Sequence, residues 1–146
     1  MALTIRDASL TDAPTLAQLM CELGYKTTAT EMLQRLRSIL SDKCFRTFVA
    51  EIDDQVCGMI GTLTHASHEH NDPSGKIIAL VVLKKHRRSG VGRALIAAAE
   101  RDFMKRGVTR LSLTTRLTRV EAHRFYQALG YSPNGTRFVK ELPGAN

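Results

Sequence analysis

The sequence predicts a single α+β (mixed α/β) domain in which a central, mostly antiparallel sheet carries helices on both faces. Three observations support this fold class. The chain has 146 residues, enough for one ordinary domain with its own core, and we expect one domain over residues 1–146. Its apolar residues recur at helical spacing in some segments and form strand-like runs in others. A hairpin signal in the first half favours antiparallel pairing there.

The first half supplies two helices and three strands. The first helix has apolar residues at helical spacing (Leu16, Leu19, Met20 and Leu23); it starts after Thr11 or Asp12 and ends at Gly24. A polar segment from His65 to Gly75 has the composition of a loop. In chain order, the other predicted elements are a strand, a helix and two strands joined by a turn at Asp53–Gln55: Leu3–Arg6, Thr30–Leu40, Phe45–Ile52 and Val56–Thr64.

The second half begins with a continuous apolar run, Ile77–Leu83, which is typical of a strand buried on both faces. A basic segment with two glycines follows it. In chain order, the remaining predicted elements are a helix, a strand, a helix and a short last strand: Val91–Lys105, Leu111–Thr115, Val120–Leu129 and Phe138–Val139.

Composition excludes several classes of protein. No apolar run is long enough to span a membrane, and the N-terminus shows no signal-peptide pattern, so we expect a cytoplasmic protein without a membrane partner. The three cysteines have unrelated spacings and indicate neither a disulfide framework nor a zinc motif. The net charge of +7 favours a polyanionic partner. A nucleic acid is not expected, because the basic run Lys84–Arg88 contains no aromatic residue for base stacking.

The basic segment Arg87-Arg88-Ser89-Gly90-Val91-Gly92 is a candidate phosphate-binding turn. Glycines let the backbone approach a ligand closely, and the first N–H groups of the helix that follows lack acceptors within the helix. The positive end of the helix dipole also attracts an anion such as a diphosphate. Arg87, Arg88 and Arg93 would add positive charge around it. Alternatively, the glycines only form a tight turn and the arginines are solvated.

Two other phosphate motifs do not fit this segment. A P-loop requires Lys and Ser or Thr after its last glycine, but Arg93 and Ala94 follow Gly92. A dinucleotide-binding fingerprint requires a third small residue where Leu95 stands, and it normally follows the first strand.

The segment instead resembles the R/Q-x-x-G-x-G/A cofactor motif of the GNAT superfamily of acetyl-CoA-dependent N-acetyltransferases. Arg87, Gly90 and Gly92 occupy the motif positions after Leu80-Val81-Val82. A second motif, Ala122-x-x-Phe125-Tyr126 followed by Leu129-Gly130-Tyr131, matches the family's later signature. The likeness covers essentially the whole chain, and its C-terminal half is similar to the small-molecule, aminoalkylphosphonate-type members.

The resemblance implies a GNAT-like sheet that splays between its fourth and fifth strands, with the pantetheine arm of acetyl-CoA lying in the gap as an extra strand. Backbone amides from Arg88 to Arg93 would hold the pyrophosphate. The implied cofactor-binding residues form the end of the strand, the turn and the signature tyrosine: Leu80, Val81, Val82, Arg87, Arg88, Ser89, Gly90, Val91, Gly92, Arg93 and Tyr126.

The resemblance also implies that Tyr126 is the general acid that protonates the departing thiolate of CoA; alternatively, Tyr126 only packs its helix onto the sheet. The usual glutamate base is missing, since Lys76–Ala79 contains no carboxylate. His68 and Glu69 are the candidate catalytic bases we select, with His65, His70 and Glu51 as further candidates. The three histidines could instead bind a metal, although we expect none.

We expect the acceptor to be the primary amine of a small molecule. The alternatives are a protein N-terminus or lysine as acceptor and, in other classes, a sensor that binds acyl-CoA without catalysis or a basic module that binds nucleic acid. The family's frequent pairing is compatible with a homodimer. Arg119 stands where the family often has asparagine, so it could contact a CoA phosphate or an acidic acceptor.

Overall fold

The computed structural model describes residues 2–115 and 119–144, which form two compact units. The first unit ends at Leu113 and the second begins at Thr114. The elements of the first unit, in chain order, are β1 (Leu3–Asp7), α1 (Ala13–Leu23), α2 (Ala29–Ser41), β2 (Phe45–Ile52), β3 (Gln55–His65), β4 (Ser74–Val82), α3 (Val91–Lys105) and β5 (Leu111–Ser112), with 3-10 turns at Leu10–Asp12 and Lys84–His86. The second unit contains α4 (Val120–Ala128).

The strands form one mixed sheet in the order β1-β2-β3-β4-β5. The first three pairings are antiparallel, and β4 pairs with β5 in parallel. This parallel pairing joins only Gly75 with Leu111 and Lys76 with Ser112. The predicted fold class, a mostly antiparallel mixed sheet that opens between its fourth and fifth strands, is confirmed.

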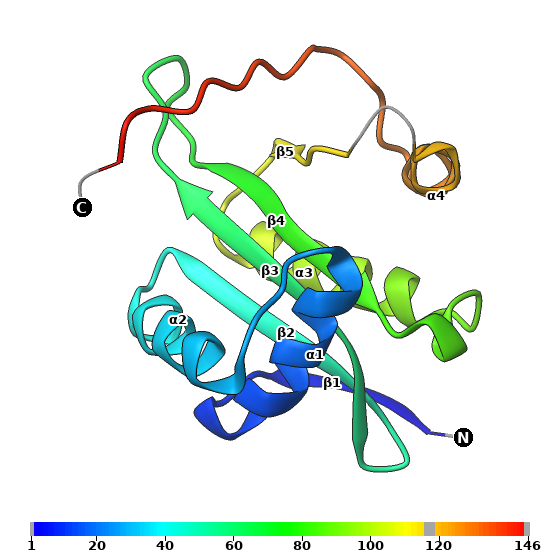
Figure 1. The fold of residues 1–146 in the computed structure, drawn as a ribbon. Coiled ribbons are helices and arrows are strands. Elements are labelled where there is room, and N and C mark those ends of the chain that lie inside the picture. The colour runs from blue at the N-terminus through cyan, green and yellow to red at the C-terminus, as the bar shows by residue number, and fades with distance from the viewer. Residues whose placement is uncertain (1, 116–118, 145–146) are drawn as a thin grey trace. The chain divides into compact units, whose positions relative to one another are not determined.

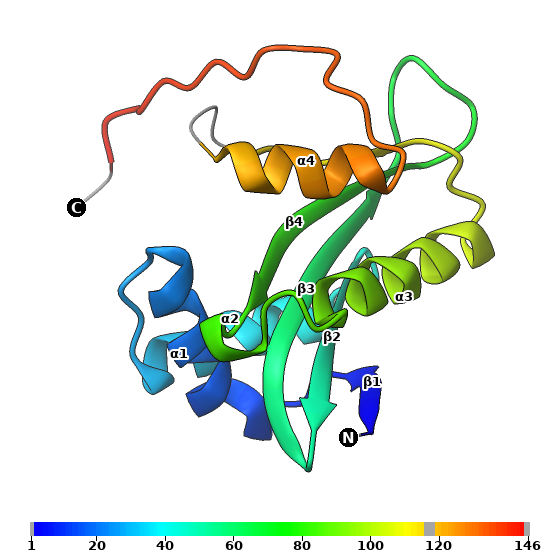
Figure 2. The ribbon, with the colours of Figure 1, turned by 90° about the vertical axis from the view of Figure 1, so that its right-hand side faces the viewer.

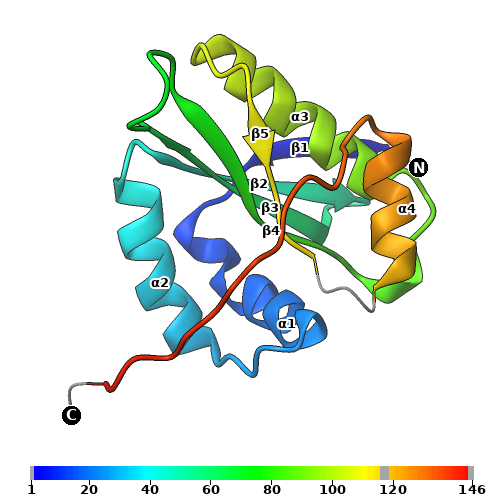
Figure 3. The same ribbon diagram turned by 90° about the horizontal axis from the view of Figure 1, so that it is seen from above.

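Helices cover both faces of the sheet in the first unit (Figures 1 and 3). On one face, α1 and α2 pack their buried residues against Val49, Met59 and Val81. On the other face lies α3 (Figure 2), whose Val91, Leu95 and Phe103 side chains approach the glycines of β3 and β4. The two layers bury the apolar side chains of both sheet faces, as the alternating apolar pattern of the strands requires.

Local capping explains where the first two helices begin and end. Gly24 has φ = 110°, a left-handed conformation that glycine adopts without the Cβ penalty, and it ends α1. At the start of α2, Thr28 and Glu31 form a capping box with bonds of 2.9 and 3.1 Å. The box begins the helix at Ala29, one residue before the predicted start.

A β-bulge at Ile78 changes the face alternation of β4. Gly61 of β3 is opposite Ala79 and Thr62 is opposite Ile77, so Ile78 is an extra residue in β4. Bulges bend a strand and increase its local twist. Ile78 is 45% exposed, so the predicted burial of the Ile77–Leu83 run on both faces is wrong at this residue. The reason is tertiary, because α1 and α2 leave the Ile78 side chain exposed on their face of the sheet, whereas Ile77, on the α3 face, is buried.

Two predicted strands differ in the structure. The strand predicted over Leu111–Thr115 is reduced to Leu111–Ser112. The predicted strand at Phe138–Val139 is absent, and these side chains are 93% and 68% exposed. A β-strand needs a neighbour for its backbone hydrogen bonds. Leu111–Ser112 has one in β4, whereas residues 113–115 and 138–139 have no strand partner among the described residues.

None of the helices in residues 2–115 and 119–144 is long and apolar enough to cross a membrane.

Candidate functional site

The turn between β4 and α3 has the backbone of an anion-binding turn. Arg88 and Gly90 adopt left-handed conformations, with φ values of 68° and 87°. Gly90 is the N-cap of α3, and the helix's first backbone bond runs from the Ala94 N–H to the Gly90 carbonyl at 3.0 Å. The amides of Val91, Gly92 and Arg93 precede that bond and have no acceptor within the helix. They can therefore donate to an anion, and the helix dipole favours one there.

Arg87 stabilises this turn, whereas we expected it to supply mobile charge. Its Nε donates to the Val82 carbonyl at 3.1 Å, and its Nη2 lies 3.9 Å from the Glu22 carboxylate of α1. Glu22 also accepts a bond from the Lys84 backbone N–H at 3.3 Å. The Ser89 hydroxyl donates to the His86 carbonyl and tightens the turn further. The exposed Arg93 remains available to a ligand.

The edge of β4 beside this turn is open. Past Lys76, the described residues provide no further pairing between β4 and β5. The backbone of residues 77–82 therefore presents hydrogen-bonding groups on the side where β5 would continue. The cofactor-binding residues expected on this strand, Leu80, Val81 and Val82, lie along this stretch. An extended amide-bearing chain could pair with it as an added strand.

Tyr126 lies on α4 in the second unit, in a small aromatic cluster. Its ring makes edge contacts with Phe125 and Tyr131, with centroid separations of 5.2 and 6.0 Å. Burial raises the pKa of the Tyr126 hydroxyl above its ordinary value, and the positive charge of Arg119 opposes this shift. A partly buried phenol with a raised pKa keeps its proton at neutral pH, as a general acid must.

The candidate bases lie on the segment between β3 and β4. His68, Glu69 and His70 are exposed there, and the His70 N–H donates to the Ser67 hydroxyl at 3.1 Å. His65, at the end of β3, contacts its neighbouring Ala66 carbonyl through Nδ1 at 2.9 Å. Among the residues that the structure describes, no three His, Cys, Asp or Glu side chains are grouped so that they could hold a metal.

Glu51, another candidate base, forms an ion pair instead. The Arg6 guanidinium binds Glu51 and also Asp12, whose carboxylate it contacts at 2.8 and 2.9 Å. Arg6 thereby joins β1, β2 and the start of α1. We interpret Glu51 as a structural residue in this arrangement.

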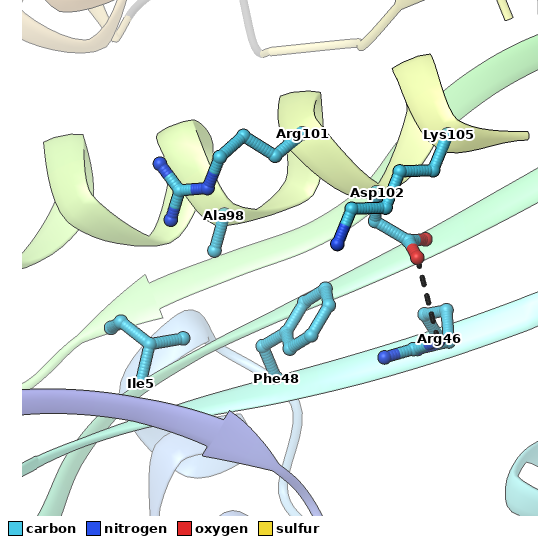
Figure 4. A pocket seen from close by; sticks show the side chains of 7 residues that line it. All are labelled: Ile5, Arg46, Phe48, Ala98, Arg101, Asp102 and Lys105. Carbon is cyan, nitrogen blue, oxygen red and sulfur yellow. Dashed lines mark ion pairs between the residues drawn. The ribbon is translucent and has the colours of Figure 1, made fainter.

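A shallow pocket on the α3 face lies between β1, β2 and α3, and its lining is shown in Figure 4. Arg46 crosses it and pairs with Asp102 of α3 at 3.4 Å and with Asp7 of β1 at 2.9 Å. Its guanidinium also lies 4.9 Å from the centre of the Phe48 ring. Since one arginine joins three elements here, we interpret the pocket as part of the packing between sheet and helix.

Two positioning contacts were missed in the sequence. Glu22 binds the turn after β4 from 62 residues away, and Asp72 binds Arg110 from 38 residues away, at 3.2 and 3.3 Å. Asp72 also accepts a bond from the Thr109 hydroxyl, and so it fixes the end of the histidine-bearing segment beside β5. Neither carboxylate belongs to a local motif, so no pattern of spacing could reveal its partner.

Comparison with known proteins gives a consistent result. The Acetyltransferase (GNAT) family matches residues 13–131. An aminoalkylphosphonate N-acetyltransferase of Salmonella typhimurium is 30% identical over 151 residues, covering 94% of this chain and 90% of that protein. An aminoglycoside N(6')-acetyltransferase type 1 of Stenotrophomonas maltophilia is 32% identical over 132 residues, covering 88% and 85%. The chain spans about half the length of other curated relatives, such as human N-acetyltransferase 8.

Solved structures show the same fold. AAC(6')-Iy in complex with the bisubstrate analog CoA-S-monomethyl-acetylneamine superimposes with a TM-score of 0.86 at 21% identity, covering 98% of this chain and all of that one.

Proposed function

The chain belongs to the GNAT family of acetyltransferases and is an N-acetyltransferase, and on this basis we propose that it transfers an acetyl group from acetyl-CoA to the primary amine of a small molecule. The observation that carries the proposal is the left-handed turn at Arg88 and Gly90, which leads into the start of α3 beside the open edge of β4. The names of two relatives, which act on aminoalkylphosphonates and aminoglycosides, support a small-molecule acceptor.

The turn and the open edge suit the two ends of this cofactor. The amides of Arg88 to Arg93, with the Arg93 side chain, would hold the pyrophosphate. Leu80, Val81 and Val82 would pair through their backbone with the amides of the pantetheine arm. Because most of these contacts use main-chain groups, substitutions at side chains other than the glycines should be tolerated.

The proposed reaction is a direct attack. The neutral amine nitrogen adds to the thioester carbonyl, the C–S bond breaks, and the thiolate takes a proton from Tyr126. The nitrogen loses one proton as the amide forms, and this proton restores the Tyr126 hydroxyl. The amine must first lose a proton, because an amine of pKa about 10.4 is only about one part in a few thousand neutral at pH 7. For this step we assign His68 or Glu69, which lie on the segment that Asp72 attaches beside β5.

The experiment that tests the proposal incubates the protein with acetyl-CoA and a panel of primary amines, and it follows thiol release and the mass of the product. Amine-dependent release is the expected result. A protein that binds acetyl-CoA but releases no thiol with any amine would be a sensor, and the proposal would fail. Transfer only to protein N-termini or lysines would keep the chemistry and refute the small-molecule acceptor.

The base assignment has its own readout. Removing the group that accepts the amine proton should lower kcat most at neutral pH, with partial recovery as the pH approaches the pKa of the amine. The variants His68→Gln and Glu69→Gln, compared across a pH series, separate the two candidates. A parallel loss at every pH in both variants would remove both residues from this role.

A further inference from the structure

The side-chain charge on the open part of the sheet indicates which small-molecule amines could serve as the acceptor. This inference rests on the proposed function. The strands β3, β4 and β5 contain no Asp or Glu and only one lysine, Lys76. Lys76 is exposed, and it lies at the end of the short parallel pairing, where β4 separates from β5.

Strand alternation shows which face of the sheet Lys76 occupies. Gly75 and Ile77 are buried, and a Cβ on Gly75 would meet the Phe103 ring of α3. Lys76 therefore lies on the opposite face, the one that α1 and α2 cover farther along the sheet. Ile78 lies on this face too, because its side chain is adjacent to Gly61, which follows Met59 of the α1 and α2 core on the same side of β3.

Lys76 and Ile78 together form an exposed patch at the bulge. The patch lies at a distance from the turn between β4 and α3 that a pantetheine arm could span. The cofactor's pyrophosphate would bind at the start of α3, which follows the end of β4. From Val82 back to Lys76 the strand covers about 20 Å at about 3.3 Å per residue. A pantetheine arm extended along the open edge therefore brings the thioester near Ile78. On the α3 face this region is packed against Phe103, so an acceptor must approach from the Lys76 face.

An approaching amine thus meets a positive charge. Six carboxylates of the first unit are already paired with arginines elsewhere: Asp7, Asp12, Glu22, Glu51, Asp72 and Asp102. The exposed Glu69, on the segment before β4, is a candidate base for the amine end of the acceptor and so leaves Lys76 to the other end. We propose that the acceptor is an amine that also carries an acid group, that Lys76 pairs with this acid group, and that Ile78 contacts the carbon chain between the two ends. A polycationic acceptor is disfavoured by repulsion from the same lysine.

The test uses three matched amines that differ only in their second substituent: 2-aminoethylphosphonate, ethanolamine and ethylenediamine, with longer homologues of each. The full-length protein should use the anionic amine with a kcat/KM at least about tenfold above that of the neutral one. Rates are measured over a pH series, so that the different amine pKa values do not bias the comparison. In Lys76→Met this preference should vanish through a rise in KM with little change in kcat, because the pairing is made equally in ground and transition states.

Charge reversal and a matched control complete the test. Lys76→Glu should favour the diamine over the phosphonate. Lys105→Glu makes the same charge change at an exposed residue of α3, on the other face, and should keep the original preference. Equal use of the three amines by the unaltered protein, or a preference that survives in Lys76→Met, would refute this inference and leave the proposed function standing. Bound acetyl-CoA with no thiol release from any amine would refute both.

Discussion

Tyr126 is the residue on which the proposed chemistry most depends, and its environment suits a proton donor. Burial raises the pKa of its hydroxyl, so the phenol stays protonated at neutral pH and beyond its ordinary pKa of about 10. A family motif indicated this residue, but the packing of Phe125 and Tyr131 against its ring is a property of the folded second unit.

Replacing Tyr126 by phenylalanine removes the proton and keeps the ring contacts. We expect Tyr126→Phe to lower kcat severalfold or more, with little change in the Kd for acetyl-CoA, because the hydroxyl acts only as the thiolate leaves. Steady-state kinetics and calorimetric binding provide the two numbers. In the unaltered protein, the raised pKa means that kcat should show no decline from this group below about pH 10. Full activity in the phenylalanine variant would exclude Tyr126 from the mechanism.

Asp12 is the residue with the clearest electrostatic effect on stability. Its side chain is 8% exposed, and hydrogen bonds from Arg6 lower the pKa of its carboxyl below the ordinary value, with help from the Ser9 N–H at 2.8 Å. A lowered pKa in the folded state contributes stability at pH values above the unfolded pKa. That contribution is lost as the pH falls through the folded pKa.

The variant Asp12→Asn should therefore be less stable than the unaltered protein by about 1–2 kcal/mol at pH 7, a moderate value because Arg6 is partly exposed. The difference should shrink below about pH 4 as the carboxylate takes up protons. Urea unfolding at pH 7 and pH 3 measures both values. Asp54→Asn, in the exposed β2–β3 turn, is the control and should change stability by less than about 0.5 kcal/mol. A difference independent of pH would contradict the electrostatic explanation.

At the scale of elements, glycines set how closely α3 packs on the sheet. A Cβ on Gly75 would lie 2.7–2.8 Å from atoms of the Phe103 ring and 2.8 Å from Leu111. Phe103 is 1% exposed, so its ring has no space into which it could move. A Cβ on Gly61, on the other face, would make ordinary contacts at 3.5–3.9 Å. The two glycines therefore form a matched pair.

Gly75→Ala should destabilise the protein by about 1–3 kcal/mol through overpacking, whereas Gly61→Ala should cost less than about 1 kcal/mol. Chemical denaturation of both variants gives the comparison. Because Gly75 pairs with Leu111, the larger variant should also disturb the short β4–β5 pairing, seen as faster amide exchange there. Equal stability of the two variants would show that the Phe103 packing is looser than the distances indicate.

At the scale of the whole molecule, binding the proposed cofactor should stabilise the fold by mass action. Acetyl-CoA at about 100 times its Kd adds about 2.7 kcal/mol, which for a chain of this size corresponds to a rise in Tm of roughly 5–10 °C. Gly90→Ala should remove most of this rise, because its φ of 87° is costly for any residue with a Cβ, and the turn would change shape.

Gly24→Ala is the control for that substitution. Gly24 has φ = 110°, and like Gly90 it has no atom within 4 Å of an added Cβ, but it lies at the end of α1. Both variants should melt at lower temperature without ligand, and only Gly24→Ala should keep the full rise on addition of acetyl-CoA. The same rise in both variants would mean that the turn after β4 does not bind the cofactor.

Much of this protein could be predicted from local patterns. The left-handed glycine at Gly24 and the glycine pair at Gly90 and Gly92 act within a few residues, so the sequence displays them directly. The capping box at Thr28 was recognised only in the structure. Hydrophobic periodicity likewise predicted α1, α2 and α3, and apolar runs with turn signals between them predicted the first four strands. The two ordered motifs around Gly90 and Tyr126 are sufficient to identify the family.

Other features depend on neighbours that lie far away in the sequence. The predicted strand at Phe138–Val139 has a suitable composition but no partner in the described residues, and Leu111–Thr115 is paired only over its first two residues. Arg87 forms an ion pair with Glu22 of α1 and so stabilises the turn between β4 and α3. The position of Arg87 in the cofactor motif does not reveal this role.

By itself, the sequence determined the family, the approximate positions of the helices and the turn that can receive an anion, because each of these depends on residues that are close together along the chain. Only the tertiary structure decided that the β4–β5 pairing stops at Lys76, that Ile78 forms a bulge, and that Lys76 is exposed on the strands β3 to β5, which have no carboxylate. These properties arise from pairing and packing between distant segments, and the acceptor that we propose depends on them.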